Sequence, residues 1–139
     1  MKDPVLRSMA KDVLGMTEED LAKVTPEQER GFKNAMTNMG KYRLVAEVAK
    51  SKCCAAGCRI GQKIVVNVDA SQIDKDASDC PLCPGAIASL SRSCSILFDR
   101  YVQNREVAAP MENVDCIDPG FENGGLGSVV FKVRVEPIS

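Results

Sequence analysis

The sequence predicts an α+β protein, in which one helix covers a small, mostly antiparallel sheet and a helical extension precedes it. Three observations predict this class. Residues 1–40 carry repeated helix-start patterns. Residues 41–139 contain three segments in which apolar and polar residues alternate, as in half-buried strands. Between these strands, residues 84–103 have the spacing of one amphipathic helix. We therefore expect a helical extension, 1–40, and a cysteine-rich α+β metal-binding domain, 41–139.

The extension is expected to contain three short helices. Asp3 is a suitable N-cap, Pro4 fits the first helical position and Gly15 fits the end of that helix. Segments 17–20 and 25–28 both have the form of a capping box, so each should begin another helix. The apolar faces of these helices could cover a core of their own or bind a partner, and the first alternative is favoured.

The strands and the long helix are predicted from the spacing of their apolar residues. In the strands these residues are Tyr42, Leu44, Ala46 and Val48, then Ile64, Val66 and Val68, and finally Val129, Phe131, Val133 and Val135. In the helix they recur every three or four positions, at Ile87, Leu90, Cys94, Leu97 and Tyr101. We expect this helix face to cover the sheet.

Composition excludes several classes of protein. The chain has 139 residues, enough for a core that does not require a metal for folding. Its 18 basic and 19 acidic residues give a net charge of −1 and no basic face, so no nucleic-acid partner is expected. There is no apolar run of the roughly 20 residues that would cross a membrane, and no signal-peptide pattern at the N-terminus. These features predict a cytoplasmic protein with reduced thiols.

Seven cysteines and the absence of histidine are the most informative features of the composition. Four cysteines form two close pairs, Cys54 with Cys58 and Cys80 with Cys83, and Cys116 follows at a distance. Paired thiols at this spacing typically converge on a soft metal ion or an iron–sulfur cluster. We therefore predict that four of these five cysteines bind one metal centre. Without histidine, the chain itself cannot activate a nucleophile by the usual Ser-His or Cys-His pairing.

The remaining cysteines are expected to be structural. Cys94 lies on the apolar face of the predicted helix, where a small buried hydrophobe is common. Cys53 and Cys54 are adjacent, and successive strand side chains point to opposite faces, so one of them should pack in the protein. Cys54 is the better ligand candidate because segment 55–57 can turn the chain back toward Cys58. Cys83 precedes a helix, whose dipole would stabilise its thiolate.

Segments 54–62, 82–86 and 114–118 together resemble a family of small uncharacterised cysteine-containing proteins, found mostly in anaerobic microbes. That family has a Cys-x-x-Gly-His-x-x-Gly-Asp loop, a Cys-Pro element that opens a helix, and a late Cys-Pro-Asp or Cys-Phe-Asp. Segment 124–127 is similar to the Gly-Gly-Trp-Gly ending of its longer members, which also carry a helical N-terminal extension. The resemblance spans about residues 42–136 and is loose between the motifs.

The resemblance implies a site but no reaction. It places Cys54, Cys83 and Cys116 at the cysteine positions of the family. Cys80 matches a further cysteine that is found in the longer members. The chain departs from the pattern where Cys58 replaces the family's histidine, Gln62 its aspartate and Leu126 its tryptophan. Exchange of histidine for cysteine keeps the ability to bind a metal, which favours a metal ligand over an acid–base residue.

Two metal centres and three functions stay open. Two compact cysteine pairs would suit zinc, whereas a [4Fe-4S] cluster accepts ligands from three segments and would include Cys116. The anaerobic association slightly favours the cluster. The expected function is then electron transfer, or an accessory subunit of a larger anaerobic enzyme. The alternatives are a structural zinc module for protein interaction and a small metal- or thiol-dependent enzyme. A protein partner or a homo-oligomer is expected.

Overall fold

The computed structural model describes residues 1–67, 72–108 and 112–138. Within these residues the helices and the short 3-10 helix are α1 (Pro4–Leu14), α2 (Glu18–Lys23), α3 (Pro26–Asn38), α4 (Pro84–Val102) and η1 (Phe121–Asn123). The strands are β1 (Tyr42–Lys52), β2 (Lys63–Asn67), β3 (Gln72–Ile73), β4 (Asn113–Asp115) and β5 (Ser128–Pro137). They form one antiparallel sheet in the order β3-β2-β1-β5-β4. The predicted α+β class is confirmed.

The three N-terminal helices begin and end as their sequences predict. The Asp3 carboxylate accepts hydrogen bonds from the first turn of α1, and Gly15 ends that helix with a left-handed φ of 67°. The threonines Thr17 and Thr25 form reciprocal capping boxes with the residues three positions later. Side-chain caps of this kind satisfy amide groups that have no partner within the helix, which explains three separate short helices.

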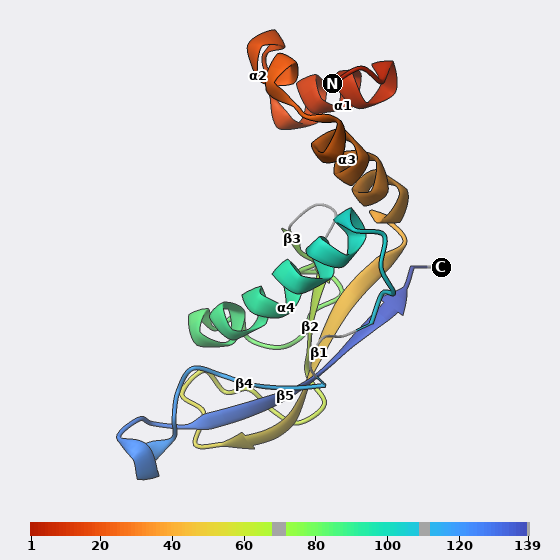
Figure 1. Ribbon diagram of the computed structural model, residues 1–139. Helices are drawn as coiled ribbons and strands as arrows, with labels where there is room; N and C mark the ends of the chain where they lie inside the picture. Colours follow the sequence, from red (N-terminus) through yellow and green to blue (C-terminus); the bar gives the residue numbers. More distant parts are fainter. Residues whose placement is uncertain (68–71, 109–111, 139) are drawn as a thin grey trace.

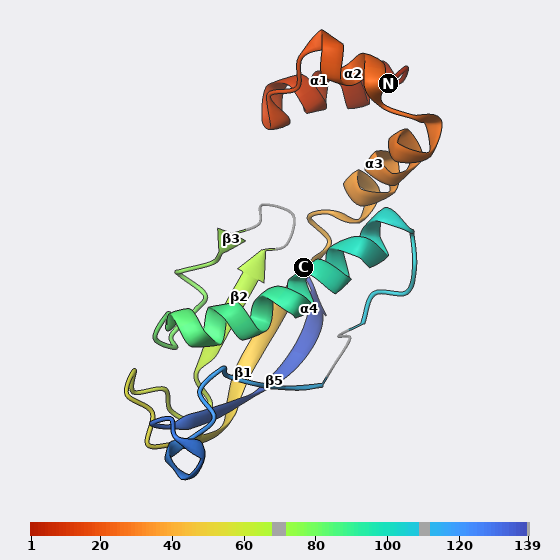
Figure 2. The same ribbon diagram turned by 60° about the vertical axis from the view of Figure 1, so that its left-hand side comes forward.

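The N-terminal helices enclose a small hydrophobic core of their own, apart from the core of the sheet (Figures 1 and 2). Its buried residues are Met1, Leu6, Ala10 and Leu21, with Met16, Val24, Phe32 and Met36 packed around them. The far end of α3 contacts the end of α4. There the side-chain amides of Asn34 and Asn38 donate hydrogen bonds to the carbonyl oxygens of Val102, at 3.0 Å, and Tyr101, at 3.3 Å.

The main core lies between α4 and one face of the sheet (Figure 2). Leu44 is paired with Val66 on one side and Val135 on the other, so neighbouring strands point apolar side chains to the same face. The opposite face carries ion pairs, including Arg43 with Glu136 at 3.1 Å. The predicted alternation agrees with this arrangement in β5. In β1 and β2, however, Val45 and Val65 are paired with each other and are buried as well, although they point to the opposite face; Val68 lies outside the described residues.

The buried face of α4 differs slightly from the predicted one. The helix runs close to the expected bounds, and its buried residues are Ala86, Leu90, Ser93, Leu97 and Tyr101. Ile87 and Cys94 instead border a groove beside the core. The apolar stripe of α4 is wider than the strip of sheet that it covers. Spacing alone does not distinguish the residues of the stripe that face the sheet from those that face the groove. The edge strands β3 and β4 were not predicted, because a strand of two or three residues is too short to show an alternation of apolar and polar side chains.

Replacement of Phe131 should test the main core. Phe131 is fully buried between the sheet and α4, so Phe131→Ala is expected to lower the free energy of unfolding by about 3–5 kcal/mol. Urea denaturation followed by circular dichroism measures the change. Phe98→Ala is the matched control, because this phenylalanine is 43% exposed, and it should cost less than about 1 kcal/mol. Equal losses in the two variants would contradict the described core.

Candidate metal centre

Two of the predicted ligands are in contact at the end of the sheet where β1 leads into β2 and the chain enters α4, and two more pack against the same core beside them. Cys58 and Cys80 are in direct contact, with their sulfur atoms 3.5 Å apart. The Cys58 thiol lowers the pKa of Cys54, and the charges of Cys54 and Cys83 raise the pKa of Cys80. Each cysteine pair therefore contributes to a single cluster, which we call the thiol cluster: Cys54, Cys58, Cys80 and Cys83.

A sharp reversal of the chain after β1 places Cys54 in the cluster. Cys53 adopts a left-handed φ of 54°, and Gly57 and Gly61 have φ values of 79° and 90°. The Gly57 amide donates to the Cys54 carbonyl at 3.1 Å and closes the turn. Glycine accepts these backbone conformations at little cost, which is why the sequence can turn twice within nine residues. The prediction that segment 55–57 returns Cys58 to the side of Cys54 agrees with this geometry.

Backbone amides surround the Cys54 sulfur. Burial alone would raise the pKa of Cys54, but hydrogen bonds from the backbone N–H groups of Cys58, Ala56 and Gly57 and from the Cys58 thiol outweigh it. The pKa of Cys54 therefore falls below its ordinary value. Amide donors near a sulfur stabilise the thiolate, the form of cysteine that binds metals.

Cys58 and Cys80 have the opposite environment. Each side chain is only 5% exposed. Burial, together with the neighbouring thiols of Cys80 and Cys54, raises the pKa of Cys58 to about 12. Burial also raises the pKa of Cys80; the Cys58 thiol opposes this shift, and the negative charge of Asp79 adds to it. Both thiols are consequently neutral near pH 7 unless a cation replaces their protons.

The backbone holds Cys80 and Cys83 where a compact pair is needed. The Cys80 amide donates to the Lys63 carbonyl at 3.1 Å, which ties the segment to the start of β2. The Cys83 amide donates to the Pro81 carbonyl at 2.9 Å and forms a tight turn. Cys83 is the N-cap residue of α4, with Pro84 at the first helical position, as predicted. Its half-buried thiol thus lies at the positive end of the helix dipole.

Cys116, the fifth predicted ligand, packs against the same main core as the thiol cluster. It follows β4, is half-buried against the main core, and its thiol donates to the Asp118 carbonyl at 3.8 Å. The next residue, Ile117, lies against the start of α4, since a Cβ atom on Gly85 would be 3.1 Å from its side chain. The neighbour of Cys116 in sequence therefore lies beside the turn that carries Cys83, and ligation by Cys116 stays a prediction.

The thiol cluster is not a finished coordination sphere. Among the residues that the structure describes, no three histidine, cysteine, aspartate or glutamate side chains converge in an arrangement ready for a metal ion. The contact between Cys58 and Cys80 nevertheless fits two ligands of one ion. With bonds of 2.3 Å, two sulfurs of a tetrahedral zinc site are about 3.8 Å apart. Closure requires the other sulfurs to move toward that pair, and ligation by these cysteines stays a prediction.

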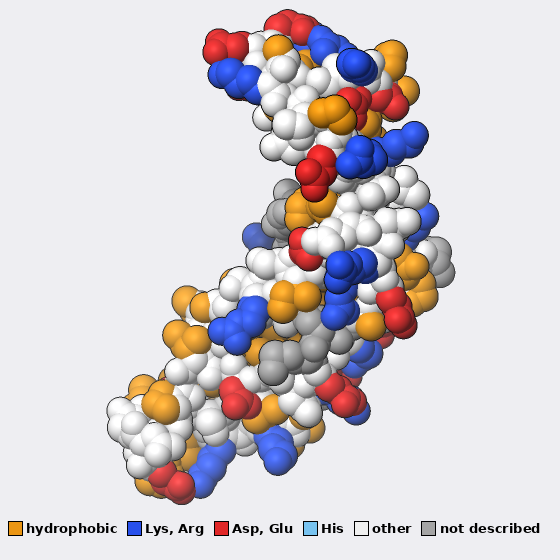
Figure 3. All heavy atoms as spheres, in the orientation of Figure 1, with side chains coloured by type: hydrophobic (Ala, Val, Ile, Leu, Met, Phe, Trp, Pro, Cys, Tyr) orange, Lys and Arg blue, Asp and Glu red, His pale blue; other side chains and the backbone are white. Residues whose placement is uncertain are grey.

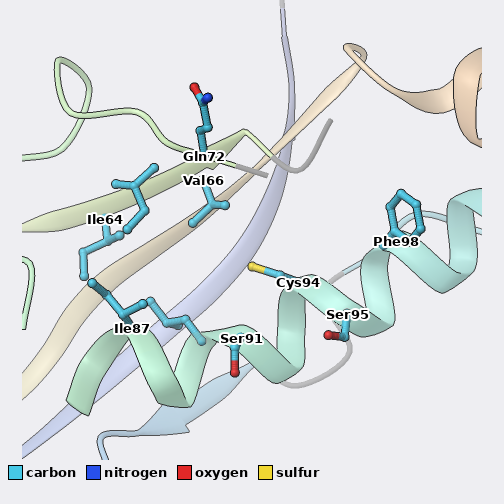
Figure 4. A pocket seen from close by; sticks show the side chains of 10 residues that line it. Ile64, Val66, Gln72, Ile87, Ser91, Cys94, Ser95 and Phe98 are labelled. Carbon is cyan, nitrogen blue, oxygen red and sulfur yellow. The ribbon is translucent and has the colours of Figure 1, made fainter. Parts of the chain in front are cut away.

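The two other cysteines differ from expectation in instructive ways. Cys53 is exposed, so the prediction that one of the adjacent cysteines packs in the protein is wrong for Cys53: the chain leaves the sheet at this residue. Cys94 is half-buried, and burial raises its pKa. Its thiol points into an apolar groove of about 570 Å³ between α4 and the strands β2 and β3 (Figure 4). Ile64, Val66 and Ile87 are among the residues that line this groove.

An ordered loop connects β4 to β5 next to the thiol cluster. The Asp118 carboxylate accepts hydrogen bonds from the backbone amides of Gly120, Leu126 and Gly127 at 3.0–3.2 Å. These bonds lower the pKa of Asp118 and hold both ends of the loop together. The sequence marks this loop as a turn next to Cys116, but it does not indicate that Asp118 organises it.

Five of the ten large apolar side chains that are exposed in the described residues lie in the loops around the thiol cluster. They are Ile60, Leu82, Ile117, Phe121 and Leu126. Figure 3 shows apolar side chains on the surface at the end of the molecule that carries η1. We call these five residues the apolar rim. The sequence analysis missed it, because loop residues follow no helical or strand period; the signal present was a large apolar residue in each of three polar loops.

Comparison with known proteins gives no relative: no family model, no curated protein and no solved structure matches the chain significantly. The resemblance to the cysteine-containing family therefore stays a prediction. In the described part of the chain, every helix is too short or too polar to cross a membrane.

Alkylation should distinguish the cysteines of the cluster. In metal-free protein near neutral pH, iodoacetamide is expected to modify Cys54 before Cys58, because backbone amides lower the pKa of Cys54 while burial raises that of Cys58. Peptide mass spectrometry at increasing times gives the order, and a Cys53→Ser background removes the exposed neighbour. Faster labelling of Cys58 would contradict the described environment.

Replacement of Gly127 should disturb the start of the cysteine loop. A Cβ atom at Gly127 would lie 2.2 Å from the carbonyl oxygen of Cys53, so the two backbones must separate in Gly127→Ala. We expect a loss of about 1–3 kcal/mol in the free energy of unfolding, as for other overpacked sites. Ser128→Ala, one residue further along β5, is the control. A fully stable Gly127→Ala protein would show that the close approach is not required.

Proposed function

We propose that Cys54, Cys58, Cys80 and Cys83 bind one metal ion as thiolates, and that this centre organises a surface for a protein partner. One observation carries the proposal: the sulfur atoms of Cys58 and Cys80, one from each cysteine pair, are 3.5 Å apart. Two pairs that are 22 residues apart in sequence meet with their thiols facing each other. That arrangement is typical of zinc sites built from two compact turns.

The contact favours a single tetrahedral ion over the cluster that the sequence slightly favours. In a [4Fe-4S] cluster each cysteine binds a different iron, so ligand sulfurs are held apart by the cluster. In a single-ion site all four sulfurs share one metal and nearly touch each other. Zinc is the expected ion. Iron in the same four-thiolate site is the second candidate, because it has the same geometry and would support electron transfer.

The surroundings of the site suit a negatively charged metal–thiolate group. Zinc with four thiolates carries a net charge of −2, which requires donors nearby. The backbone amides around Cys54 and the N-terminus of α4 at Cys83 supply them. Such a centre needs reduced thiols, consistent with the proposed location in the cytoplasm.

The apolar rim supports interaction as the role of this centre. Ile60 lies in the loop that carries Cys54 and Cys58, and Leu82 lies between Cys80 and Cys83. A metal bound by all four cysteines would fix both loops and therefore both exposed side chains. Exposed apolar groups gathered at one end are typical of protein-binding surfaces. We propose a protein partner there, or a second copy of the chain.

Metal analysis of single variants tests the site. The full chain should bind one zinc ion, and Ser in place of Cys54, Cys58, Cys80 or Cys83 should each abolish tight binding. Cys53→Ser and Cys94→Ser are matched controls that should keep the metal. Cobalt substitution should give the intense visible bands of a four-thiolate site.

Cys116→Ser separates the two kinds of centre. Retention of the metal supports the single-ion site. A brown protein that contains acid-labile sulfide and loses its colour in Cys116→Ser would instead support an iron–sulfur cluster with ligands from three segments. Wild-type protein that binds neither zinc nor iron would contradict the proposal.

A further inference from the structure

The sulfur atoms of Cys54, Cys58 and Cys80 form a chain of neighbouring thiols. Cys58 is in the middle, since it accepts a hydrogen bond from the Cys80 thiol at 3.5 Å and follows the tight turn that Gly57 closes onto Cys54. Cys54 is the more exposed end of this chain, while Cys58 and Cys80 are buried. An oxidant from solvent therefore meets Cys54 before the two buried thiols.

We propose that Cys58 and Cys80 are an oxidative modification site, which a peroxide converts to a reversible disulfide, and that this reaction releases the metal. The second half rests on the proposed metal-binding function; the first half rests only on the position of the thiols. A disulfide has sulfur atoms about 2.05 Å apart, so the 3.5 Å contact must shorten by about 1.5 Å.

The local backbone allows this movement from one side. Cys80 is tied to β2 through its amide and the Lys63 carbonyl. Cys58 follows Gly57 in the turn after β1, and its carbonyl is held by the Ser51 hydroxyl at 2.6 Å. Rotation of the two side chains, with a small shift of the Cys58 turn, brings the sulfurs into bonding distance.

The chemistry balances in three steps. A peroxide oxidises the Cys54 thiol to a sulfenic acid and is itself reduced to water or an alcohol. The Cys58 thiol attacks that sulfur, releases water and forms a Cys54–Cys58 disulfide. The Cys80 thiol then attacks the Cys58 sulfur, which forms the Cys58–Cys80 disulfide and returns Cys54 to a thiol. Overall, two thiols lose two hydrogens and one peroxide takes them up.

Loss of these two thiols would remove one ligand from each cysteine pair. The remaining sulfurs, from Cys54 and Cys83, are too few to hold a tetrahedral ion tightly. Oxidation would thus release the metal and free the turns that carry Ile60 and Leu82. The same site would then report the redox state of its surroundings to whatever binds the apolar rim.

Disulfide mapping of the full chain tests this inference. Metal-free and zinc-loaded protein are treated with hydrogen peroxide, alkylated and digested, and the linked peptides are identified by mass spectrometry. The expected product is a peptide pair joined through Cys58 and Cys80, lighter by two hydrogens and separated again by a thiol reductant. In the zinc-loaded protein its formation should match zinc release, followed with a coloured chelator.

Two variants and two outcomes make the test decisive. Cys54→Ser should slow formation of the disulfide severalfold, whereas Cys94→Ser should leave its rate unchanged. Cys58 and Cys80 recovered as alkylated thiols from oxidised, metal-free protein would overturn the inference. If that protein forms the disulfide but the reduced protein never binds zinc or iron, the modification site stands and the proposed metal function fails.

Discussion

The cysteine end of the molecule depends on one steric constraint, the close approach of the β5 backbone to the end of β1. Gly127 lies so near the Cys53 carbonyl that even one methyl group would not fit between them. The two strands are hydrogen-bonded up to Lys52 and Ser128, and at the next residue the chain turns out of the sheet. This exit sets the direction of the loop that carries Cys54 and Cys58. The contact between Cys58 and Cys80 therefore depends on where β1 ends.

The fold could be predicted largely because its elements obey local rules. Asp3, Thr17 and Thr25 form helix caps from purely local sequence. In β5, Phe131 and Val133 alternate with Lys132 and Arg134, which is the pattern of a half-buried strand. The burial of Ile87 and Cys94 could not be predicted in the same way. Both belong to the apolar stripe of α4, but how far the sheet extends beneath them is decided by β2 and β3, which are distant in sequence.

The candidate site was predictable in composition and less so in geometry. Spacing indicates that Cys54 and Cys58, and likewise Cys80 and Cys83, are near each other. It does not indicate that Cys58 and Cys80 touch, since this requires the β1–β2 pairing to bring two loops together. It also misplaces Cys53, because a strand rule was applied to a residue at which the strand has already ended. The role of Asp118 depends on three amides from one loop and has no counterpart in the spacing.

The N-terminal helices contact the main core of the protein at the C-terminal end of α4, although they have a separate core of their own. The last carbonyl groups of a helix have no partner within it, and in α4 those of Tyr101 and Val102 are bound by the side-chain amides of Asn38 and Asn34. The extension thus caps the C-terminus of α4, the helix that covers the sheet. A shortened chain that begins at β1 would lose these two hydrogen bonds, and α4 would fray from its C-terminal end, which is the end furthest from Cys83. A boundary drawn from composition alone would separate α3 from α4, although these two helices are in contact in the described part of the chain.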